Sequence, residues 1–199
     1  MTTGIRRFQP ADLEALYRIC LCTGAHGEDA TALYNDPKLL GSFYAAPYAV
    51  HDPDLCLIAT ADGAPAGYIL GTEDSARFRT WSEVHWFPAL RARYPLPAPA
   101  DESPDAALIR LLHAGYQPHP DTLAYPAHLH IDLLPSLRGR GLGRALMQRF
   151  LDRLRARGCP AVHLGVSAAN TGGIAFYEKL GFHLIGDYPG WRAYGMKLA

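Results

Sequence analysis

The most constraining feature of this sequence is a segment rich in glycine and arginine, LRGRGLGRALM, at residues 137–147. It follows a run of alternating polar and apolar residues, HLHIDLL, and leads into an amphipathic pattern that continues to Arg157. A glycine inside a helix costs about 0.5–1 kcal/mol relative to alanine. Gly139, Gly141 and Gly143, at the expected start of a helix, therefore indicate that the bare backbone is needed there.

The glycines predict an anion-binding site between the strand and the helix. They leave consecutive N–H groups uncovered, and the helix N-terminus adds about half a positive charge. The guanidinium groups of Arg138, Arg140 and Arg144 lie beside this point and suit phosphate oxygens. The dinucleotide fingerprint G-x-G-x-x-G fails, because Arg144 stands at its third glycine, and the G-x-x-x-x-G-K-[ST] loop is absent.

Composition favours a globular chain. Of the 199 residues, 49% are hydrophobic and 19% charged, which is enough apolar content to bury a sizeable core. The formal net charge of zero gives no general attraction to nucleic acid or to an anionic membrane, and we expect neither as a partner. Because we find neither an apolar signal segment nor a run of 18 apolar residues, we expect a cytoplasmic protein.

The cysteines do not suggest a metal site. Cys20 and Cys22 form a close pair, but no second pair with the spacing of zinc ligands follows. Together with Cys56 and Cys159 they are predicted to be reduced thiols.

Hydropathy patterns predict a mixed α/β fold, because strands and helices alternate in the last third of the chain. Strands are expected at 4–8, 55–59, 66–72, 127–134, 161–167, 181–188 and 191–198. Helices are expected from Pro10 onward and at 103–117, 142–157 and 171–180, with a turn at the Asp-Gly of ADGA. The stretch 23–53 is mixed and is expected to hold short helical turns.

Residues 73–127 form an unusual segment that is rich in aromatic residues and proline. We interpret it as an insertion of helices and loops before the fourth strand, so that 1–199 is a single domain. Trp81, Trp86 and Tyr94 are candidates to line a substrate pocket, although a packed cap would have the same composition.

Two motifs resemble those of the GNAT superfamily of acyl-CoA-dependent N-acetyltransferases. Arg138, Gly141 and Gly143 match its pyrophosphate loop, R-x-x-G-x-G. One helix and one strand later, NTGGIAFYEKLGF matches N-x6-Y-x3-G-F at Asn170, Tyr177, Gly181 and Phe182. The resemblance implies a twisted, mostly antiparallel sheet of about seven strands flanked by helices, with acetyl-CoA as the cofactor.

A second resemblance is narrower. The segments WSEVHWFPALRARYP and HIDLLP are similar to the acetyltransferase-like domain at the C-terminus of animal O-GlcNAcases. Those domains lack an intact phosphate loop, whereas this chain keeps it, which implies a free-standing relative that binds the cofactor.

The GNAT resemblance implies a set of cofactor contacts. Backbone groups of Leu133 and Leu134 would meet the pantetheine arm and the acetyl carbonyl, and the loop would hold the pyrophosphate. The expected cofactor-binding residues are Leu133, Leu134, Arg138, Gly139, Arg140, Gly141, Leu142, Gly143, Arg144, Asn170 and Tyr177. Leu133 could equally be a core residue, and Asn170 could act as a helix N-cap, with or without a cofactor contact.

Tyr177 is the candidate general acid, because a phenol beside the sulfur could protonate the departing CoA thiolate. A tyrosine packed in the core is the alternative. For the base, His128, His130 and Asp132 share one face of the strand at 127–134, opposite the leucines. Asp132 lies nearest the thioester end, and His130 has the better intrinsic pKa.

We therefore expect Asp132, and after it His130, as the general base, directly or through water. The alternative is a hydrogen-bonded polar face without a catalytic role. His128 is expected to border the substrate pocket.

The sequence thus predicts an acetyl-CoA-dependent N-acetyltransferase that transfers the acetyl group directly to an amine in a ternary complex. The acceptor is a small molecule or a protein amine, and the protein is a monomer or a homodimer. A non-catalytic acyl-CoA-binding or interaction module is the alternative, and histone acetylation would rest on analogy alone.

Overall fold

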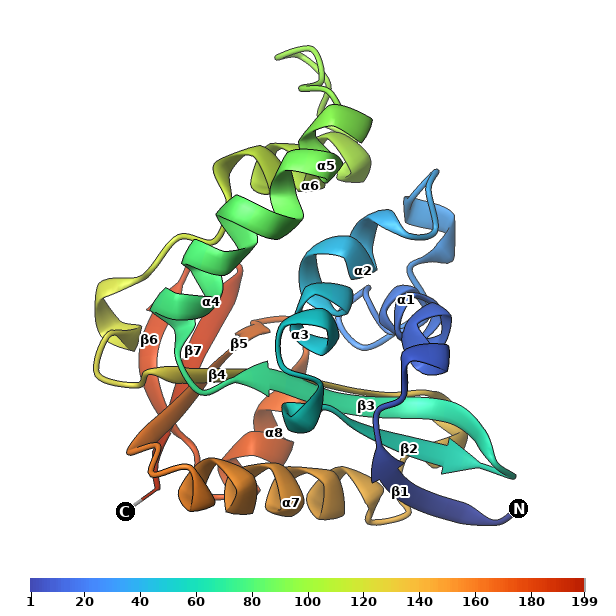
Figure 1. The fold of residues 1–199 in the computed structure, drawn as a ribbon, viewed down its shortest axis with the longest axis vertical. Helices are drawn as coiled ribbons and strands as arrows, with labels where there is room; N and C mark the ends of the chain where they lie inside the picture. The colour runs from blue at the N-terminus through green and yellow to red at the C-terminus, as the bar shows by residue number, and fades with distance from the viewer. Residues whose placement is uncertain (199) are drawn as a thin grey trace.

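The computed structural model describes residues 1–198, which contain one seven-stranded sheet of order β1-β2-β3-β4-β5-β7-β6 (Figure 1). Every neighbouring pair is antiparallel except β4 and β5, which are parallel. The strands are β1 Thr3–Arg7, β2 Leu57–Ala61, β3 Ala64–Thr72, β4 Ala127–Leu133, β5 Ala161–Ser167, β6 His183–Tyr188 and β7 Trp191–Lys197. The predicted mixed, mostly antiparallel sheet is confirmed.

Helices cover both faces of the sheet (Figure 1). On one face lie α7 (Leu142–Ala156) and α8 (Thr171–Lys179). On the other face lie α1 Leu13–Leu21, α2 Leu39–Tyr44, α3 Ala46–His51, α4 Ser75–Trp81, α5 Phe87–Arg93 and α6 Pro104–Ala114. A π-helical segment, Ser82–Trp86, joins α4 to α5, so the segment predicted as an insertion consists of helices and loops and precedes β4.

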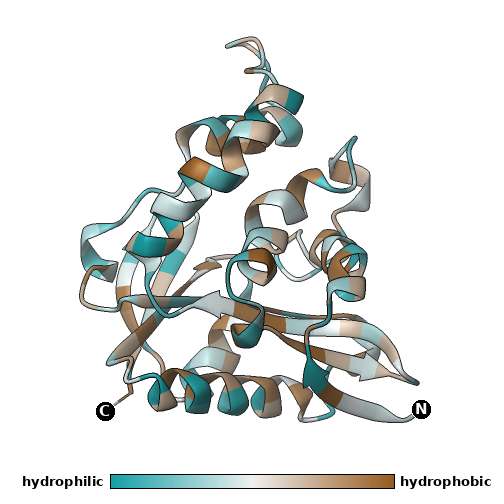
Figure 2. Ribbon diagram, viewed as in Figure 1, coloured by the Kyte–Doolittle hydropathy of each residue, from teal (hydrophilic) through white to brown (hydrophobic). Residues whose placement is uncertain are grey.

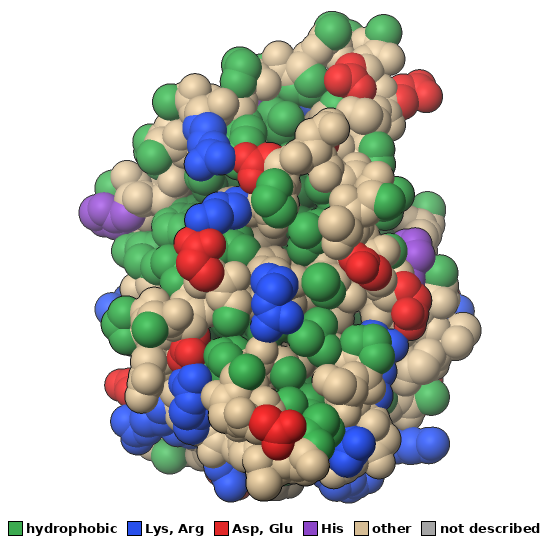
Figure 3. Space-filling model, turned by 90° about the vertical axis from the view of Figure 1, so that its right-hand side faces the viewer, with side chains coloured by type: hydrophobic (Ala, Val, Ile, Leu, Met, Phe, Trp, Pro, Cys, Tyr) green, Lys and Arg blue, Asp and Glu red, His purple; other side chains and the backbone are tan. Residues whose placement is uncertain are grey.

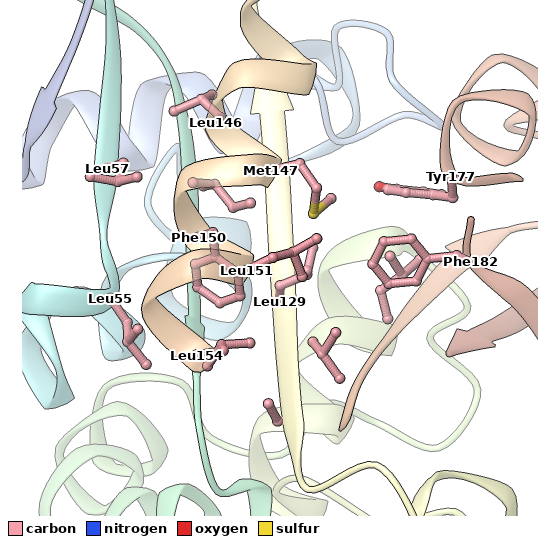
Figure 4. Close-up of a cluster of buried hydrophobic side chains, with 14 of the residues drawn as sticks. Leu55, Leu57, Leu129, Leu146, Met147, Phe150, Leu151, Leu154, Tyr177 and Phe182 are labelled. Atoms are coloured by element: carbon pink, nitrogen blue, oxygen red, sulfur yellow. The ribbon is translucent and has the colours of Figure 1, made fainter. Parts of the chain in front are cut away.

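The longest helix, α7, packs an apolar stripe against the sheet. Leu146, Phe150 and Leu154 recur at helical spacing and are fully buried. Apolar and polar residues alternate along α7 in Figure 2, and Figure 4 shows Phe150 and Leu151 facing Leu129 of β4. The first core therefore lies between α7, α8 and this face of the sheet.

A second core fills the space between the opposite face and the helices α1 to α6. It centres on Tyr48, Phe78 and Phe87, each at most 1% exposed. The rings of Tyr48 and Phe78 are stacked with centroids 4.3 Å apart, which ties α3 to α4. Residues predicted as an insertion thus share one core with the N-terminal helices.

Boundaries differ from the sequence prediction in a few places. Pro53 starts a short 3-10 turn, Pro53–Leu55, so β2 begins at Leu57 and not at residue 55. The hairpin turn is confirmed at Asp62 and Gly63, which both have positive φ, and β3 begins two residues earlier than predicted, at Ala64. The predicted helix 103–117 ends at Ala114, because Gly115 adopts φ 70°.

The pairing of β4 with β5 ends early, and this shapes the rest of the molecule. Only two parallel pairs form, Ala127 with Val162 and His128 with His163. β4 nevertheless continues to Leu133, held along its length by β3. Past His128 the two strands therefore separate, and the β5-facing edge of β4 is left without a partner strand among the described residues.

We predict that Phe150→Ala lowers the free energy of unfolding by about 3–5 kcal/mol, because it removes a fully buried ring between α7 and β3. Denaturant-induced unfolding measures the loss. Gln148→Ala, on the exposed side of α7, is the control and should change stability by less than about 0.5 kcal/mol. Similar losses for both variants would contradict this account of the core.

Candidate active site

The three glycines of the loop after β4 serve two different purposes. Gly139 and Gly141 have φ values of 72° and 78°, which L side chains rarely adopt, and nothing approaches their missing Cβ atoms. Gly143 is instead close-packed, because a Cβ there would lie 3.3 Å from the Phe176 ring and 3.4 Å from Leu133. The first two glycines shape an open turn, and the third lets α7 approach α8 and the end of β4.

The open turn delivers free amide groups to one place. The N–H of Ala145 donates to the carbonyl of Gly141, 3.0 Å away, in the first turn of α7. The amides of Leu142, Gly143 and Arg144 precede that bond and have no intrahelical acceptor. With the helix dipole, this end of α7 has the properties of an anion site.

The arginines of the loop do not all face that site. Arg138 forms an ion pair with Glu28 (2.9 Å) and donates to the carbonyls of Leu133 (3.2 Å) and Gly27. Its guanidinium therefore fastens the 22–30 loop to the end of β4, and a phosphate contact of the Arg138 side chain stays a prediction. Arg140 donates from Nε to Ser136, which leaves its terminal nitrogens uncommitted.

The two leucines at the end of β4 differ in their backbone groups. The N–H of Leu134 donates to Ala66 at 2.9 Å, and its carbonyl accepts from Leu137 at 2.9 Å. The N–H of Leu134 is therefore used within the chain, whereas its carbonyl oxygen keeps a second lone pair, and a cofactor contact of Leu134 stays a prediction. Because neighbouring residues in an antiparallel ladder face opposite sides, Leu133 directs its N–H away from β3, toward the side where β5 has separated.

Asn170 acts as the N-cap of α8. Its side-chain oxygen accepts a hydrogen bond from the amide of Gly173 at 2.8 Å. The same side chain borders Gly27, so Asn170 also lies beside the 22–30 loop. The capping alternative is thus confirmed, and a cofactor contact stays a prediction.

Tyr177 belongs to the first core but lies near the polar end of β4. It is 9% exposed and points toward Met147 of α7 (Figure 4). Burial, together with the negative charge of Asp132, raises the pKa of the Tyr177 phenol. The phenol therefore keeps its proton at neutral pH, as a general acid must.

Asp132 combines partial burial with an unusually high pKa. The hydroxyl of Tyr68 donates to its Oδ2 at 2.5 Å. Desolvation raises the pKa of Asp132 from 3.8 to about 6, although hydrogen bonds from Tyr68 and Thr23 and the charge of Arg138 oppose the rise. A carboxylate with this pKa is ionised at neutral pH and is a stronger base than an ordinary aspartate.

The two histidines of β4 lie on the same face as Asp132 and contact Tyr48. Its hydroxyl lies 2.9 Å from Nε2 of His128 and 3.1 Å from Nε2 of His130. Burial lowers the pKa of His130 to about 4 and that of His128 well below 6.5, so both imidazoles are neutral. Of the two predicted bases, Asp132 is better suited than His130 to accept a proton at neutral pH.

A cavity of about 710 Å³ opens on this face. His128 and His130 line it, and so do Tyr44, Tyr48 and Tyr116. The three tyrosines were not predicted as site residues. The signal for Tyr44 and Tyr48 is their helical spacing in the stretch 23–53, whose structure the sequence leaves open, and the signal for Tyr116 is its place in the aromatic segment 73–127.

Trp81, Trp86 and Tyr94 do not line this cavity, so the prediction for these three side chains is wrong. Trp86 donates to the carbonyl of Ser42 at 2.8 Å, and Tyr94 donates to Asp36 at 2.7 Å. The ring of Trp81 stacks on Phe78 and Trp86. All three hold the helical layer together from behind, as a packed cap does.

The outer surface carries charges of both signs. On the face drawn in Figure 3, acidic and basic side chains are interspersed, and Lys and Arg are more frequent toward the bottom of the view. Across residues 1–198 no group of three or more His, Cys, Asp or Glu has a metal-binding arrangement, and no helix is long and apolar enough to cross a membrane. The four cysteines are unpaired.

Comparison with known proteins agrees with the fold and the loop. The profile of the Acetyltransferase (GNAT) family matches residues 106–182. A [ribosomal protein bS18]-alanine N-acetyltransferase of Salmonella typhimurium is 32% identical over 130 residues, which cover 65% of this chain and 80% of the relative. The chain belongs to the GNAT family of acetyltransferases.

Two solved structures extend the comparison. The crystal structure of SsHAT matches this GNAT chain with a TM-score of 0.93 and 41% identity, and all of both chains are covered. The PaiA N-acetyltransferase of Thermoplasma acidophilum, solved in complex with coenzyme A, matches with a TM-score of 0.57 and 18% identity over 99% of both chains, which shows a shared fold.

We predict that Asp132→Asn stabilises the protein at neutral pH but not in acid. The folded pKa of Asp132 is raised, so its contribution to stability is fully present below about pH 4 and is lost as pH rises through about 6. The variant should gain about 1–3 kcal/mol relative to wild type at pH 7 and almost nothing at pH 4. Urea unfolding of the variant and of wild type at pH 4 and at pH 7 measures the difference in the free energy of unfolding.

Gln148→Ala, an exposed substitution that removes no titrating group, is the control, and its stability difference from wild type should be the same at pH 4 and pH 7. An equal effect of Asp132→Asn at pH 4 and pH 7 would contradict the raised pKa.

Proposed function

We propose that this GNAT enzyme transfers an acetyl group from acetyl-CoA directly to an amine in a ternary complex. The observation that carries the proposal is the separation of β4 from β5, with the amides of α7 at one end of the opening and Asp132 and Tyr177 along it. An alternative role as a non-catalytic module has no comparable support.

The residues at the opening fit acetyl-CoA. Amides of Leu142, Gly143 and Arg144 would receive the pyrophosphate, because no Cβ at Gly139 or Gly141 obstructs them. The terminal guanidinium nitrogens of Arg140 and the side chain of Arg144 would add positive charge. Farther along, the free N–H of Leu133 would bind the pantetheine arm, which needs amide partners.

Proton movements follow from the pKa shifts. Bound acetyl-CoA would supply the acetyl group as a thioester. The carboxylate of Asp132 would accept the proton that the attacking amine loses, directly or through water. The hydroxyl of Tyr177, which holds its proton, would deliver it to the departing sulfur.

The cavity on the polar face of β4 would hold the acceptor. Ser75, Arg79 and Tyr116, from the segment predicted as an insertion, line it, which supports a role of that segment in acceptor binding. The Salmonella relative acts on an alanine of a ribosomal protein, and an acceptor of this chain would be either such a protein amine or a small molecule. The likeness to O-GlcNAcase domains stays a prediction, as does a monomeric or dimeric state.

We predict that Gly141→Asp weakens the binding of CoA at least about tenfold, because the carboxylate blocks the amides and repels phosphate. Isothermal titration with CoA measures the dissociation constant, and circular dichroism checks the fold.

Gly158→Asp is a matched control. Gly158 has φ 74° and an equally open Cβ direction, but it lies at the far end of α7. Equal affinities of a folded Gly141→Asp variant and wild type would overturn the phosphate-loop assignment.

We also predict that Tyr177→Phe keeps its affinity for CoA and loses about tenfold or more in turnover, because the ring is retained and only the proton donor is removed. Release of free thiol from acetyl-CoA is followed with benzylamine, spermidine and an N-terminal alanine peptide as acceptors. Wild-type turnover in the variant would remove Tyr177 from the mechanism.

A further inference from the structure

The cavity beside β4 has the size and lining of a small-molecule site. Its volume of about 710 Å³ lies within the range of roughly 300–1,000 Å³ typical of ligand pockets. Aromatic rings from α2, α3, the segment after α6 and β7 surround it, among them Tyr44, Tyr48, Tyr116 and Trp191. Such walls suit a ligand with an apolar or ring-bearing body.

The charges at the cavity do not favour a polycation. Apart from the neutral histidines, Asp74 and Arg79 are its charged lining residues, and their charges oppose each other. The carboxylate of Asp74 is also occupied as the N-cap of α4, where it accepts from the amides of Ala76 (2.9 Å) and Arg77 (3.0 Å). A long cation such as a polyamine would therefore find little compensation for its desolvation.

A chain of hydrogen bonds ends at this cavity, and the distances fix its direction. The hydroxyl of Ser75 lies 2.7 Å from the carbonyl oxygen of Pro126, an acceptor only, so Ser75 must donate there. Its oxygen also lies 2.7 Å from Nδ1 of His128. Because the single hydroxyl proton is already used, Nδ1 of His128 must carry the proton and donate to Ser75.

The rest of the chain follows from that tautomer. A neutral His128 with a proton on Nδ1 has a bare Nε2, which accepts from the Tyr48 hydroxyl. The oxygen of Tyr48 can then only accept from His130, so Nε2 of His130 carries its proton. Tyr116, beside Tyr48 in the same cluster, donates its own proton to the carbonyl of Phe43.

His130 is left with an unprotonated Nδ1. No fully buried side-chain nitrogen or oxygen within residues 1–198 lacks a hydrogen-bond partner, and Nδ1 of His130 has none, so this atom is not fully buried, and His130 lines the cavity. Asp132 follows two residues later on the same face of β4. A neutral imidazole that lines the cavity, two residues before the proposed base, thus has an acceptor atom without a partner among residues 1–198.

We propose that this cavity binds a small primary amine with an apolar or ring-bearing body, whose N–H donates to Nδ1 of His130. Ser75, His128 and Tyr48 act as positioning residues that hold His130 in the tautomer able to accept it. The inference rests on the proposed transfer to an amine and adds the class of acceptor and the atom that orients its nitrogen.

The tautomers can be observed without any substrate. Long-range proton–nitrogen NMR correlation of the neutral imidazoles should show His128 protonated at Nδ1 and His130 at Nε2. Ser75→Ala should shift His128 toward Nε2–H, because the acceptor for Nδ1–H is gone, and Ser75→Thr should preserve the wild-type pattern. If His128 is protonated at Nε2 in wild type, the inferred direction of the hydrogen bonds from Ser75 to His130 is wrong.

Ser82→Ala is the control for the serine variant. Ser82 is buried, and its hydroxyl donates to Phe78 at 2.8 Å without touching either histidine. Tyr48→Phe is a second variant. It removes the hydroxyl that links His128 to His130 in the series of hydrogen bonds, and it keeps a ring in the core. It should alter the His130 signals, whereas Ser82→Ala should not.

Acceptor choice is tested with 2-phenylethylamine and spermidine as probes in the presence of acetyl-CoA. We expect kcat/KM for 2-phenylethylamine to exceed that for spermidine about tenfold or more, and to fall about tenfold in Ser75→Ala while the affinity for CoA is unchanged. Preference for spermidine, or no acetylation of either amine by enzyme that binds acetyl-CoA, would overturn this inference. Failure to bind acetyl-CoA would count against the proposed function instead.

Discussion

The site depends on one constraint, the need of every strand for backbone partners. β4 obtains its partners from β3 along its whole length, so it can leave β5 after two pairs without unfolding. The cost is an edge of β4 that has no partner strand in the middle of the sheet. An extended molecule with amide groups would satisfy that edge, and α7 begins beside it with free amides of its own. The opening is thus a consequence of strand pairing, and the glycine loop supplies it with an anion site.

The two faces of β4 carry different kinds of side chain, apolar residues of the core on one and the polar residues of the candidate site on the other. Leu129 and its neighbours on one face pack under α7 in the first core. His128, His130 and Asp132 on the other face lie among aromatic side chains, which remove water from them. The same desolvation acts in opposite directions, because it raises the pKa of a carboxyl and lowers that of an imidazole. Asp132 becomes a better base and His130 stays neutral, so one environment gives adjacent residues different roles.

The sequence predicted the sheet and the loop well, because both depend on local patterns. Alternation identified β4, helical spacing identified α7, and glycine identified the positive-φ turn at Gly139 and Gly141. Local patterns could not predict the long-range contacts. Arg138 pairs with Glu28, more than a hundred residues away in sequence, and the N–H of Leu134 donates to Ala66. Tyr48 and Ser75 were missed because only the packing of α3 and α4 on β4 brings them to the histidines. Trp86, by contrast, was expected at the pocket because a large aromatic residue looks the same in a wall and in a cap.

The most direct test of the account is a crystal structure of the protein with acetyl-CoA. The account predicts that the cofactor occupies the opening between β4 and β5, with its pyrophosphate on the amides that start α7, its amide arm at Leu133, and its thioester between Asp132 and Tyr177. A cofactor bound elsewhere, or an opening filled by side chains in crystals grown with saturating acetyl-CoA, would contradict it.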